Sequence, residues 1–158
     1  MTLQRSRKAP QFTLKNGSDR DIALSDFLGK WVILYFYPRD NTSGCTKEAI
    51  DFSKLVPRLS KKGTAVVGIS PDSSQSHLKF AEKHGLLVEL LSDPGHTVCE
   101  QYGVWRKKKL YGREYFGVAR TTVLIDPKGV VKHIWEKVNV PGHAAEVDTL
   151  LDSCRKAP

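Results

Sequence analysis

Cysteine and long hydrophobic runs are scarce in this sequence of 158 residues. The three cysteines, Cys45, Cys99 and Cys154, are too few and too far apart for a cysteine-rich zinc site or a disulfide framework. No stretch approaches the roughly 20 consecutive apolar residues that a membrane span needs. The first ten residues are basic without an apolar segment, which is not the pattern of a secretory signal. These absences predict a cytoplasmic chain with no disulfide scaffold, no metal and no membrane partner.

Acidic residues are also outnumbered, since 25 Lys and Arg stand against 17 Asp and Glu and the net charge is +8. The excess is concentrated in residues 1–10, in the run Arg106 to Lys109 and in Arg155 with Lys156, and the remainder is close to neutral. We expect the run 106–109 to be a solvated loop. We therefore expect no nucleic-acid partner, and we expect the ends 1–8 and 155–158 to be flexible. A basic nucleic-acid-binding or chaperone-like module is the remote alternative, because Trp105 and Tyr111 flank the run.

Strand-like and helix-like segments alternate, which is typical of an α/β domain. The continuously apolar residues 31–37 predict a central strand buried on both faces. Further strands are predicted at 64–69, 121–125 and 130–135, the last two as a hairpin. Helices are predicted at 46–59, 74–84, 95–102 and 144–153, and Pro57 should kink or end the first of them. No repeat or linker interrupts this order, so the sequence predicts a single domain over residues 1–158.

The segment after the first central strand has the composition of a reactive site. Pro38 ends the strand, a polar loop follows, and a helix should begin around Ser43 to Thr46. Cys45 then lies in the first helical turn, beyond the carboxyl end of a strand, where α/β sheets form their sites. Free backbone N–H groups and the helix dipole stabilise a thiolate there. The polar approach favours a reactive thiol over the alternative of a buried, inert cysteine.

Two neighbours of Cys45 can contribute to the same small anion site. Thr42 can present its hydroxyl to the thiolate or to a ligand oxygen, or it can instead cap the helix. Gly44 permits a close backbone approach, so its N–H can donate to the same anion. For Glu48, two interpretations stand side by side. It orients an active-site arginine, or it is an exposed acid that complements the helix dipole.

Several motifs in order along the chain resemble one known family. Pro38-x-x-x-Thr42-x-x-Cys45 is similar to the active-site motif of peroxiredoxins. Thr-x-Gly-Cys-Thr-x-Glu-Ala over residues 42–49 resembles the bacterioferritin comigratory (peroxiredoxin Q) branch of that family. Further matching segments extend the resemblance over nearly the whole chain, namely residues 9–14, 63–72, 91–94, 102–105 and 111–126.

The resemblance implies a thioredoxin-like fold, with a central mixed β-sheet flanked by helices, and reduction of hydrogen peroxide and organic hydroperoxides. It implies that Cys45 is the peroxidatic cysteine and that Pro38, Thr42 and Arg120 support it, with Gly44 and Glu48 in supporting positions. Without the resemblance, Arg120 would be interpreted as one half of a surface ion pair. No cofactor is implied, because the cysteine itself is the redox centre.

The chain departs from many relatives in lacking a second cysteine at either usual place. Ile50 stands five residues after Cys45, and Phe80 stands near the other position. Cys99 is expected to be a buried structural residue and Cys154 an exposed one, and either is an alternative resolving thiol. We therefore expect a one-cysteine mechanism, with the sulfenic acid reduced by thioredoxin, glutaredoxin or a small thiol. The branch is frequently monomeric, so a monomer or weak homodimer is expected.

The remaining chemistry-bearing residues form no recognisable pattern. The five histidines show no paired metal-ligand spacing, and we expect surface or helix-end positions for them: His77, His84, His96, His133 and His143. No phosphate-binding loop and no dinucleotide fingerprint occur. A thioredoxin-type disulfide reductase is disfavoured, because the residue three beyond Cys45 is Glu48 rather than cysteine. The sequence leaves the preferred peroxide and the role of residues 106–109 open.

Overall fold

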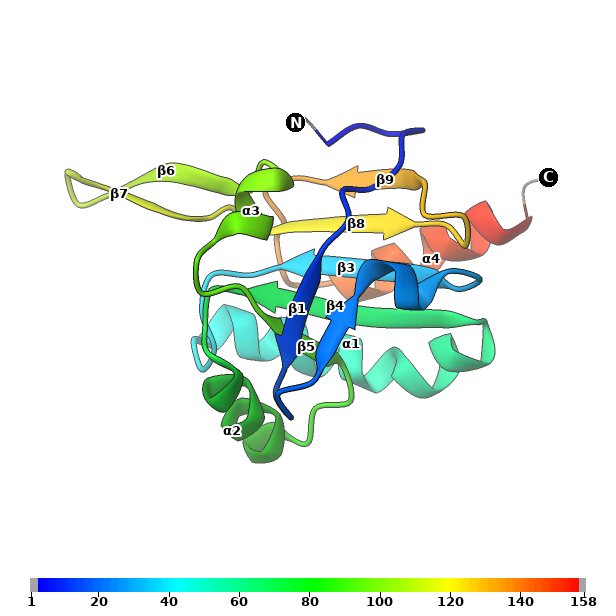
Figure 1. Ribbon diagram of the computed structural model, residues 1–158, viewed down its shortest axis with the longest axis horizontal. Coiled ribbons are helices and arrows are strands. Elements are labelled where there is room, and N and C mark those ends of the chain that lie inside the picture. The colour runs from blue at the N-terminus through cyan, green and yellow to red at the C-terminus, as the bar shows by residue number, and fades with distance from the viewer. Residues whose placement is uncertain (1–2, 157–158) are drawn as a thin grey trace.

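The computed structural model describes residues 3–156 and shows a central sheet with helices on both sides (Figure 1). The strands are β1 (Thr13–Asn16), β2 (Asp21–Ala23), β3 (Trp31–Phe36), β4 (Thr64–Ser70), β5 (Glu89–Ser92), β6 (Trp105–Leu110), β7 (Arg113–Val118), β8 (Thr121–Ile125) and β9 (Val131–Trp135). The helices are η1, a short 3-10 turn (Leu24–Phe27), α1 (Ser43–Lys61), α2 (Ser74–His84), α3 (Thr97–Gln101) and α4 (His143–Lys156).

Seven of these strands form one mixed sheet in the order β2-β1-β5-β4-β3-β8-β9. Strands β3, β4 and β5 run parallel, whereas β8 runs antiparallel to β3, with Phe36 opposite Thr121. The carboxyl end of β3 therefore lies beside the start of β8. This arrangement brings the loop after β3 close to the residues that precede β8, although about 80 residues separate them in the sequence.

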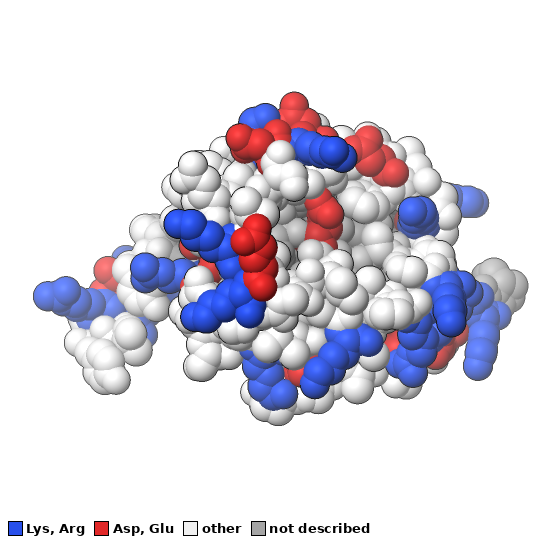
Figure 2. Space-filling model, turned by 90° about the horizontal axis from the view of Figure 1, so that it is seen from below, with Lys and Arg blue, Asp and Glu red and all other residues white. Residues whose placement is uncertain are grey.

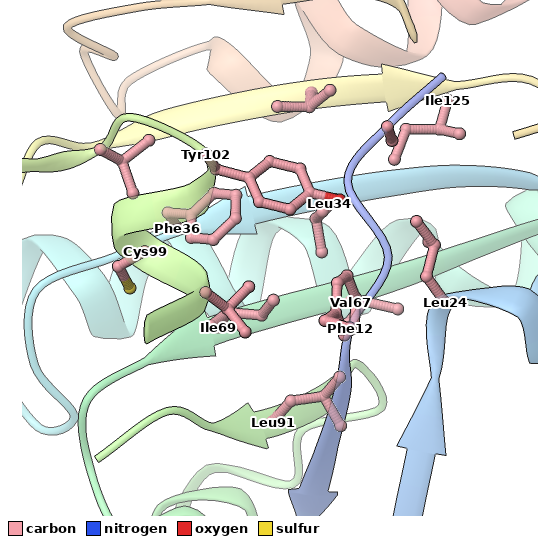
Figure 3. Packing of buried hydrophobic residues seen from close by; sticks show 14 of the residues in the cluster. Phe12, Leu24, Leu34, Phe36, Val67, Ile69, Leu91, Cys99, Tyr102 and Ile125 are labelled. Atoms are coloured by element: carbon pink, nitrogen blue, oxygen red, sulfur yellow. The ribbon is translucent and has the colours of Figure 1, made fainter. Parts of the chain in front are cut away.

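Alternating side chains of β3 enter two separate cores, as expected for a strand covered on both faces. Leu34 and Phe36 pack with the N-terminal segment and α3 on one face, as Figure 3 shows. Ile33 and Tyr35 pack with α1, α2 and α4 on the other face. The continuous apolar run that predicted a buried strand is explained by this double coverage.

The predicted elements of the sheet and its helices are confirmed, with differences at their ends. α1 continues to Lys61 although Pro57 lies inside it. Pro57 is in the last two turns, where losing one backbone hydrogen bond leaves most of the helix intact. Strands β1 and β2 and the two-stranded ribbon β6–β7, which contains the basic run 106–109, were not predicted, and no bounds were predicted for β5. That run was predicted to be a loop and is a strand instead.

Both basic ends are joined to the body in the described part of the chain. Ser6 donates its backbone N–H to Val131, and Lys8 forms a β-bridge with Val130. Arg155 and Lys156 belong to the last turn of α4. Residues 1–2 and 157–158 of the ends expected to be flexible lie outside the described residues. No helix within residues 3–156 has both the length and the apolar character required to cross a membrane.

Candidate active site

The loop between β3 and α1 places Cys45 beyond the carboxyl end of the central strand, as predicted. Cys45 is the third residue of α1 and lies in its first turn. Contrary to the expectation from its polar surroundings, the side chain is buried, with a relative exposure of 1%. Cys45 belongs to the buried cluster that contains Tyr35 and Phe52, whereas Asn41, Thr42 and Ser43 of the preceding loop are exposed.

A charged triad holds the sulfur of Cys45. The Nη2 of Arg120 donates to Sγ of Cys45 at 3.1 Å, and its Nη1 donates to Oε1 of Glu48 at 2.6 Å. Arg120 comes directly before β8, and Glu48 lies one turn along α1 from Cys45. Glu48 is buried, so the interpretation of it as an exposed acid at the helix start is wrong. Arg120 also does not form a simple surface ion pair, because its Nη2 donates to the sulfur of Cys45.

Burial sets the electrostatics of this triad. It raises the pKa of Glu48 to about 7, although the neighbouring Arg120 opposes the shift. Burial would lower the pKa of Arg120, but the charges of Glu48 and Cys45 outweigh it and raise the pKa. Arg120 is therefore permanently cationic, and its guanidinium lies against the sulfur of Cys45. The Oε2 of Glu48 is buried and has no hydrogen-bond partner in residues 3–156.

Two aromatic side chains, Tyr35 and Phe52, belong to the same buried cluster as Cys45. The Tyr35 ring stacks on Phe52 with centroids 5.0 Å apart. It also covers Gly68, where an added Cβ would stand 2.6 Å from the Tyr35 ring. The Tyr35 hydroxyl is buried without a partner in the described residues. Burial, followed by the charges of Glu48 and Cys45, raises the pKa of Tyr35 well above its usual value. Tyr35 therefore stays neutral and supplies an uncharged wall.

Thr42, Gly44 and Pro38 lie in the same loop, but their contacts differ from one another. The Thr42 hydroxyl donates to the backbone oxygen of Arg39 at 2.9 Å, so neither predicted use of it, as a helix cap or as a donor to the sulfur, is seen. A Cβ on Gly44 would stand 3.4 Å from Nη2 of Arg120, which leaves little room for a side chain. Pro38 follows β3 and opens the loop.

A second buried cluster of polar side chains forms around Asp40, in the same loop. The Nδ1 of His77 lies 2.7 Å from Oδ2 of Asp40, and its Nε2 lies 2.9 Å from the Leu91 backbone oxygen. Tyr37 donates to the other Asp40 oxygen at 2.6 Å, and Ser76 donates to Oδ2 at 2.8 Å. Both ring nitrogens of His77 therefore face hydrogen-bonding oxygens, one on Asp40 and one on the Leu91 backbone. Burial opposes ionisation of Asp40, but the bonds from His77, Tyr37 and Ser76 lower its pKa overall.

This cluster was missed in the sequence, where the histidines were expected at the surface or at helix ends, and of the two buried ones only His143 is at a helix end, as the first residue of α4. His77 is fully buried, and His143 is buried with its Nε2 2.8 Å from the Thr122 hydroxyl. Asp40 and His77 are 37 residues apart, so no local spacing signals the pair. With Asp72 they form a group of metal-ligand types, but their oxygens and nitrogens already form hydrogen bonds to one another and to neighbouring groups. The donor set therefore fits a hydrogen-bonded network better than a metal site.

Cys99 lies on the opposite face of the sheet from Cys45. It belongs to α3 and packs beside Phe36 (Figure 3). Its backbone N–H donates to Asp93 at 2.8 Å. Burial and the Asp93 carboxylate raise the pKa of the Cys99 thiol, which keeps it protonated.

Cys154 lies near the far end of α1. Two residues earlier, Asp152 pairs with Lys62 at 2.7 Å, just beyond the last residue of α1. At 1.5 Å per residue, Lys62 is about 25 Å along the helix axis from Cys45. A disulfide needs Cα atoms roughly 4–7 Å apart. The three thiols are free in this structure.

Comparison with known proteins agrees with this geometry. The family model described as AhpC/TSA family matches residues 6–134. A putative peroxiredoxin bcp of Coxiella burnetii is 50% identical over 147 residues, which cover 93% of this chain and 97% of that protein. Peroxiredoxin Bcp of Bacillus subtilis is 43% identical over 157 residues, covering 99% of this chain and all of that protein.

Solved structures give the same result. The Xanthomonas campestris bacterioferritin comigratory protein superposes with a TM-score of 0.87 at 36% identity, covering 92% of each chain. Peroxidoxin BcpB from Mycobacterium tuberculosis superposes with a TM-score of 0.84 at 33% identity, covering 96% of this chain and 97% of that one. The mixed sheet with flanking helices is therefore the thioredoxin-like fold that the motifs predicted. This chain belongs to the AhpC/TSA family and, within it, to the Bcp and peroxiredoxin Q group of peroxiredoxins.

Proposed function

We propose that this peroxiredoxin reduces hydroperoxides with Cys45 as its peroxidatic cysteine and an external thiol as its reductant. The observation that carries the assignment is the contact of Arg120 with Sγ of Cys45 at 3.1 Å, backed by Glu48 at 2.6 Å. The thiolate is the nucleophilic form of cysteine, and the guanidinium of Arg120 supplies a positive charge directly beside that sulfur.

In the oxidative step, the Cys45 thiolate attacks the terminal oxygen of the hydroperoxide. The sulfur–oxygen bond forms as the oxygen–oxygen bond breaks, so the sulfur is oxidised to sulfenic acid and the peroxide is reduced. The departing alkoxide or hydroxide takes up a proton and leaves as alcohol or water. Negative charge builds on that oxygen in the transition state, and fixed donors beside the sulfur stabilise it. The Arg120 guanidinium and the backbone N–H groups of Gly44 and Cys45 are the donors available at this place.

We assign supporting roles to the rest of the loop. Glu48 holds one arm of Arg120 and so orients the other arm toward the sulfur. Thr42 uses its hydrogen on the Arg39 carbonyl, which leaves the lone pairs of its hydroxyl oxygen free to accept a hydrogen bond from the peroxide O–H. Pro38 carries no N–H and limits the entry of water beside the site.

A one-cysteine cycle follows from where the other thiols lie. Cys99 is on the opposite sheet face, and Cys154 lies near the far end of α1. An external thiol attacks the sulfenic acid, releases water and leaves a mixed disulfide, and a second thiol releases the Cys45 thiol. Thioredoxin, glutaredoxin and small thiols are the reductant classes that perform this exchange. Resolution by Cys99 or Cys154 is the alternative, and it would need large rearrangement.

The substrate class follows from the relatives. The X. campestris protein is described by its alkyl peroxide reduction activity, and we extend this activity to the present chain. Free thiols fit the reducing environment of the cytoplasm, which is the location we propose. A monomer or weak homodimer with no nucleic-acid or membrane partner remains our prediction.

The test compares three variants that each lose one thiol: Cys45→Ser, Cys99→Ser and Cys154→Ser. Consumption of an alkyl hydroperoxide with dithiothreitol as reductant should be lost in the first, and turnover with thioredoxin as reductant should be retained in the other two. Mass spectrometry after peroxide treatment should find one added oxygen at Cys45 and no intramolecular disulfide. Full activity of the Cys45→Ser chain would contradict the peroxidase assignment. Loss of recycling in either of the other variants would contradict the one-cysteine cycle alone.

A further inference from the structure

The β6–β7 ribbon projects from the body of the molecule as a separate arm (Figure 1). Its two strands pair with each other and with no strand of the main sheet. The arm adds nothing to the core beyond its base, where Val104 and Val118 are buried. Packing in the core therefore does not explain which side chains the arm carries.

Positive charge dominates the arm. Residues 105–118 contain five Lys and Arg and one acid, Glu114. Lys107 pairs with Glu114 at 2.7 Å, and Arg106 pairs with Glu136 at 3.1 Å. Within residues 3–156 no acidic partner is found for Lys108, Lys109 or Arg113. Figure 2 shows Lys and Arg side chains over this protruding part.

Exposed apolar side chains accompany these charges. Of the seven large hydrophobic residues that are exposed in the described chain, four lie on the arm. They are Leu110, Tyr111, Tyr115 and Phe116, and Tyr111 at the tip is 96% exposed. Aromatic residues and arginine are enriched at sites of association with other proteins.

One face of the arm combines both properties. Lys108 lies opposite Tyr115 and Leu110 lies opposite Arg113, so these four side chains share a face. We call it the Lys108 face. It carries two cations without an acidic partner, two apolar residues and no acid. A surface that covers it favourably must be acidic and partly apolar.

The Lys108 face adjoins the peroxidatic site. β7 ends at Val118, two residues before Arg120, whose guanidinium touches the Cys45 sulfur. The Lys108 side chain lies over Gly117, where an added Cβ would be 3.5 Å from Cδ of Lys108. Burial lowers the pKa of Lys108, the Arg120 cation lowers it further and Cys45 opposes this, so the ammonium lies within the field of the site. Arg39, on the loop across the site, is also exposed.

We propose that the Lys108 face is the docking surface for a protein reductant whose own surface, around its reactive thiol, is acidic and apolar. A protein thiol that reaches the sulfenic acid of Cys45 must approach this end of the sheet, where it meets the arm. Charge complementarity then speeds the encounter, and Leu110 and Tyr115 supply apolar contact. This inference rests on the proposed one-cysteine cycle, because only that cycle requires an external thiol at Cys45.

The test separates the reductive step from the oxidative step. Cys45 is oxidised with one equivalent of hydrogen peroxide, and the rate of its reduction by an acidic thioredoxin is followed by stopped-flow fluorescence at low salt. The docking variant is Leu110→Ser with Arg113→Gln, both at the tip of the arm. The matched control is Leu28→Ser with Lys30→Gln, which also removes one exposed leucine and one exposed cation. These two residues precede β3, at the opposite end of that strand from Cys45.

We expect the rate constant with thioredoxin to fall about tenfold in the docking variant and its salt dependence to weaken. The rate with dithiothreitol and the rate of oxidation by peroxide should change less than about twofold in both variants. An unchanged thioredoxin rate in the docking variant would overturn the proposal, as would an equal loss with dithiothreitol. If thioredoxin does not reduce the wild-type chain although dithiothreitol does, the docking proposal fails and the peroxidase proposal stands.

A membrane surface is the competing occupant of an aromatic and basic arm. Sedimentation with vesicles that contain anionic phosphatidylserine distinguishes the two. The proposal predicts no difference between the wild-type chain and the docking variant in this assay. A variant that loses vesicle binding but keeps the thioredoxin rate would assign the face to lipid and overturn the proposal.

Discussion

Two buried groups of charged side chains flank the loop that leads into α1, and their hydrogen bonds are satisfied to different degrees. In the first group, both carboxylate oxygens of Asp40 and both ring nitrogens of His77 have partners. Around Cys45 and Arg120, one oxygen of Glu48 and the hydroxyl of Tyr35 have none within the described residues. Buried polar groups without partners are costly, so they persist where they serve a function. The contrast assigns anchoring to the first group and chemistry to the second.

The largest effect should come from breaking the anchoring pair. His77→Leu removes the ring that bonds both the buried Asp40 carboxylate and the Leu91 backbone oxygen, and we expect the free energy of unfolding to fall by about 3–5 kcal/mol. Urea denaturation measures this change. The control is Lys15→Gln, which breaks an exposed pair with Asp21 and should cost less than about 1 kcal/mol. A loss below 1 kcal/mol for His77→Leu would remove the distinction between the two groups.

Removing the cation of the other group should affect the chemistry more than the stability. We expect Arg120→Gln to slow the oxidation of Cys45 by hydrogen peroxide about 100-fold, because a fixed donor is lost from the transition state. Glu48, with a pKa of about 7, can take up a proton when its partner is removed, so this variant should lose less stability than His77→Leu. Stopped-flow fluorescence gives the rate, and Arg106→Gln is the control. Equal stability losses for Arg120→Gln and His77→Leu would argue against the division of roles.

The pH dependence of stability should distinguish Glu48 from ordinary acids. Its folded pKa of about 7 exceeds the ordinary 4.5, so the folded chain binds more protons than the unfolded chain between these values. The free energy of unfolding should therefore fall as pH rises through this window, by about 2–3 kcal/mol from Glu48 alone. Glu48→Gln should remove this decline, and Glu82→Gln on the exposed side of α2 should not. If the free energy of unfolding changes equally with pH in the wild type and in Glu48→Gln from pH 5 to pH 8, the pKa of Glu48 is not raised.

The smallest effect is expected from crowding Arg120. Gly44→Ala places a methyl group 3.4 Å from Nη2, which should shift the guanidinium slightly and slow oxidation about threefold. Stability should not fall, because alanine favours the helix over glycine. Gly95→Ala, whose Cβ would meet only the Thr97 hydroxyl at 3.6 Å, is the control. An unchanged rate for Gly44→Ala would mean that Arg120 adjusts freely.

The sequence predicted the central part of the fold and the place of Cys45 because both depend on local patterns. The apolar run 31–37 requires coverage on two faces, and the polar loop followed by a helix start defines the end of the strand. The family motifs then connected Arg120 with Cys45, which local pattern alone did not. The burial of Cys45 was not predicted, since it depends on packing with residues of other elements such as Tyr35 of β3.

The missed features depend on distant residues or lack a regular pattern. His77 of α2 is buried because Tyr37 and Asp40 from the loop after β3 and Leu91 from β5 come together around it. These residues are far from His77 in the sequence. The β6–β7 ribbon was missed because Arg106 to Lys109 is uniformly basic and shows none of the alternation of a half-buried strand. Its strands pair only with each other, so no buried face leaves a signal in the sequence.

The separation of the three thiols has a consequence for how long the protein survives in peroxide. With Cys99 on the other sheet face and Cys154 near the far end of α1, no thiol of the same chain is placed to capture an oxidised Cys45. On the proposed cycle the sulfenic acid is a branch point, at which an external thiol restores the enzyme and a second peroxide converts it to sulfinic acid. The number of turnovers that one enzyme molecule completes before it is inactivated is then set by the concentration of reductant relative to that of peroxide.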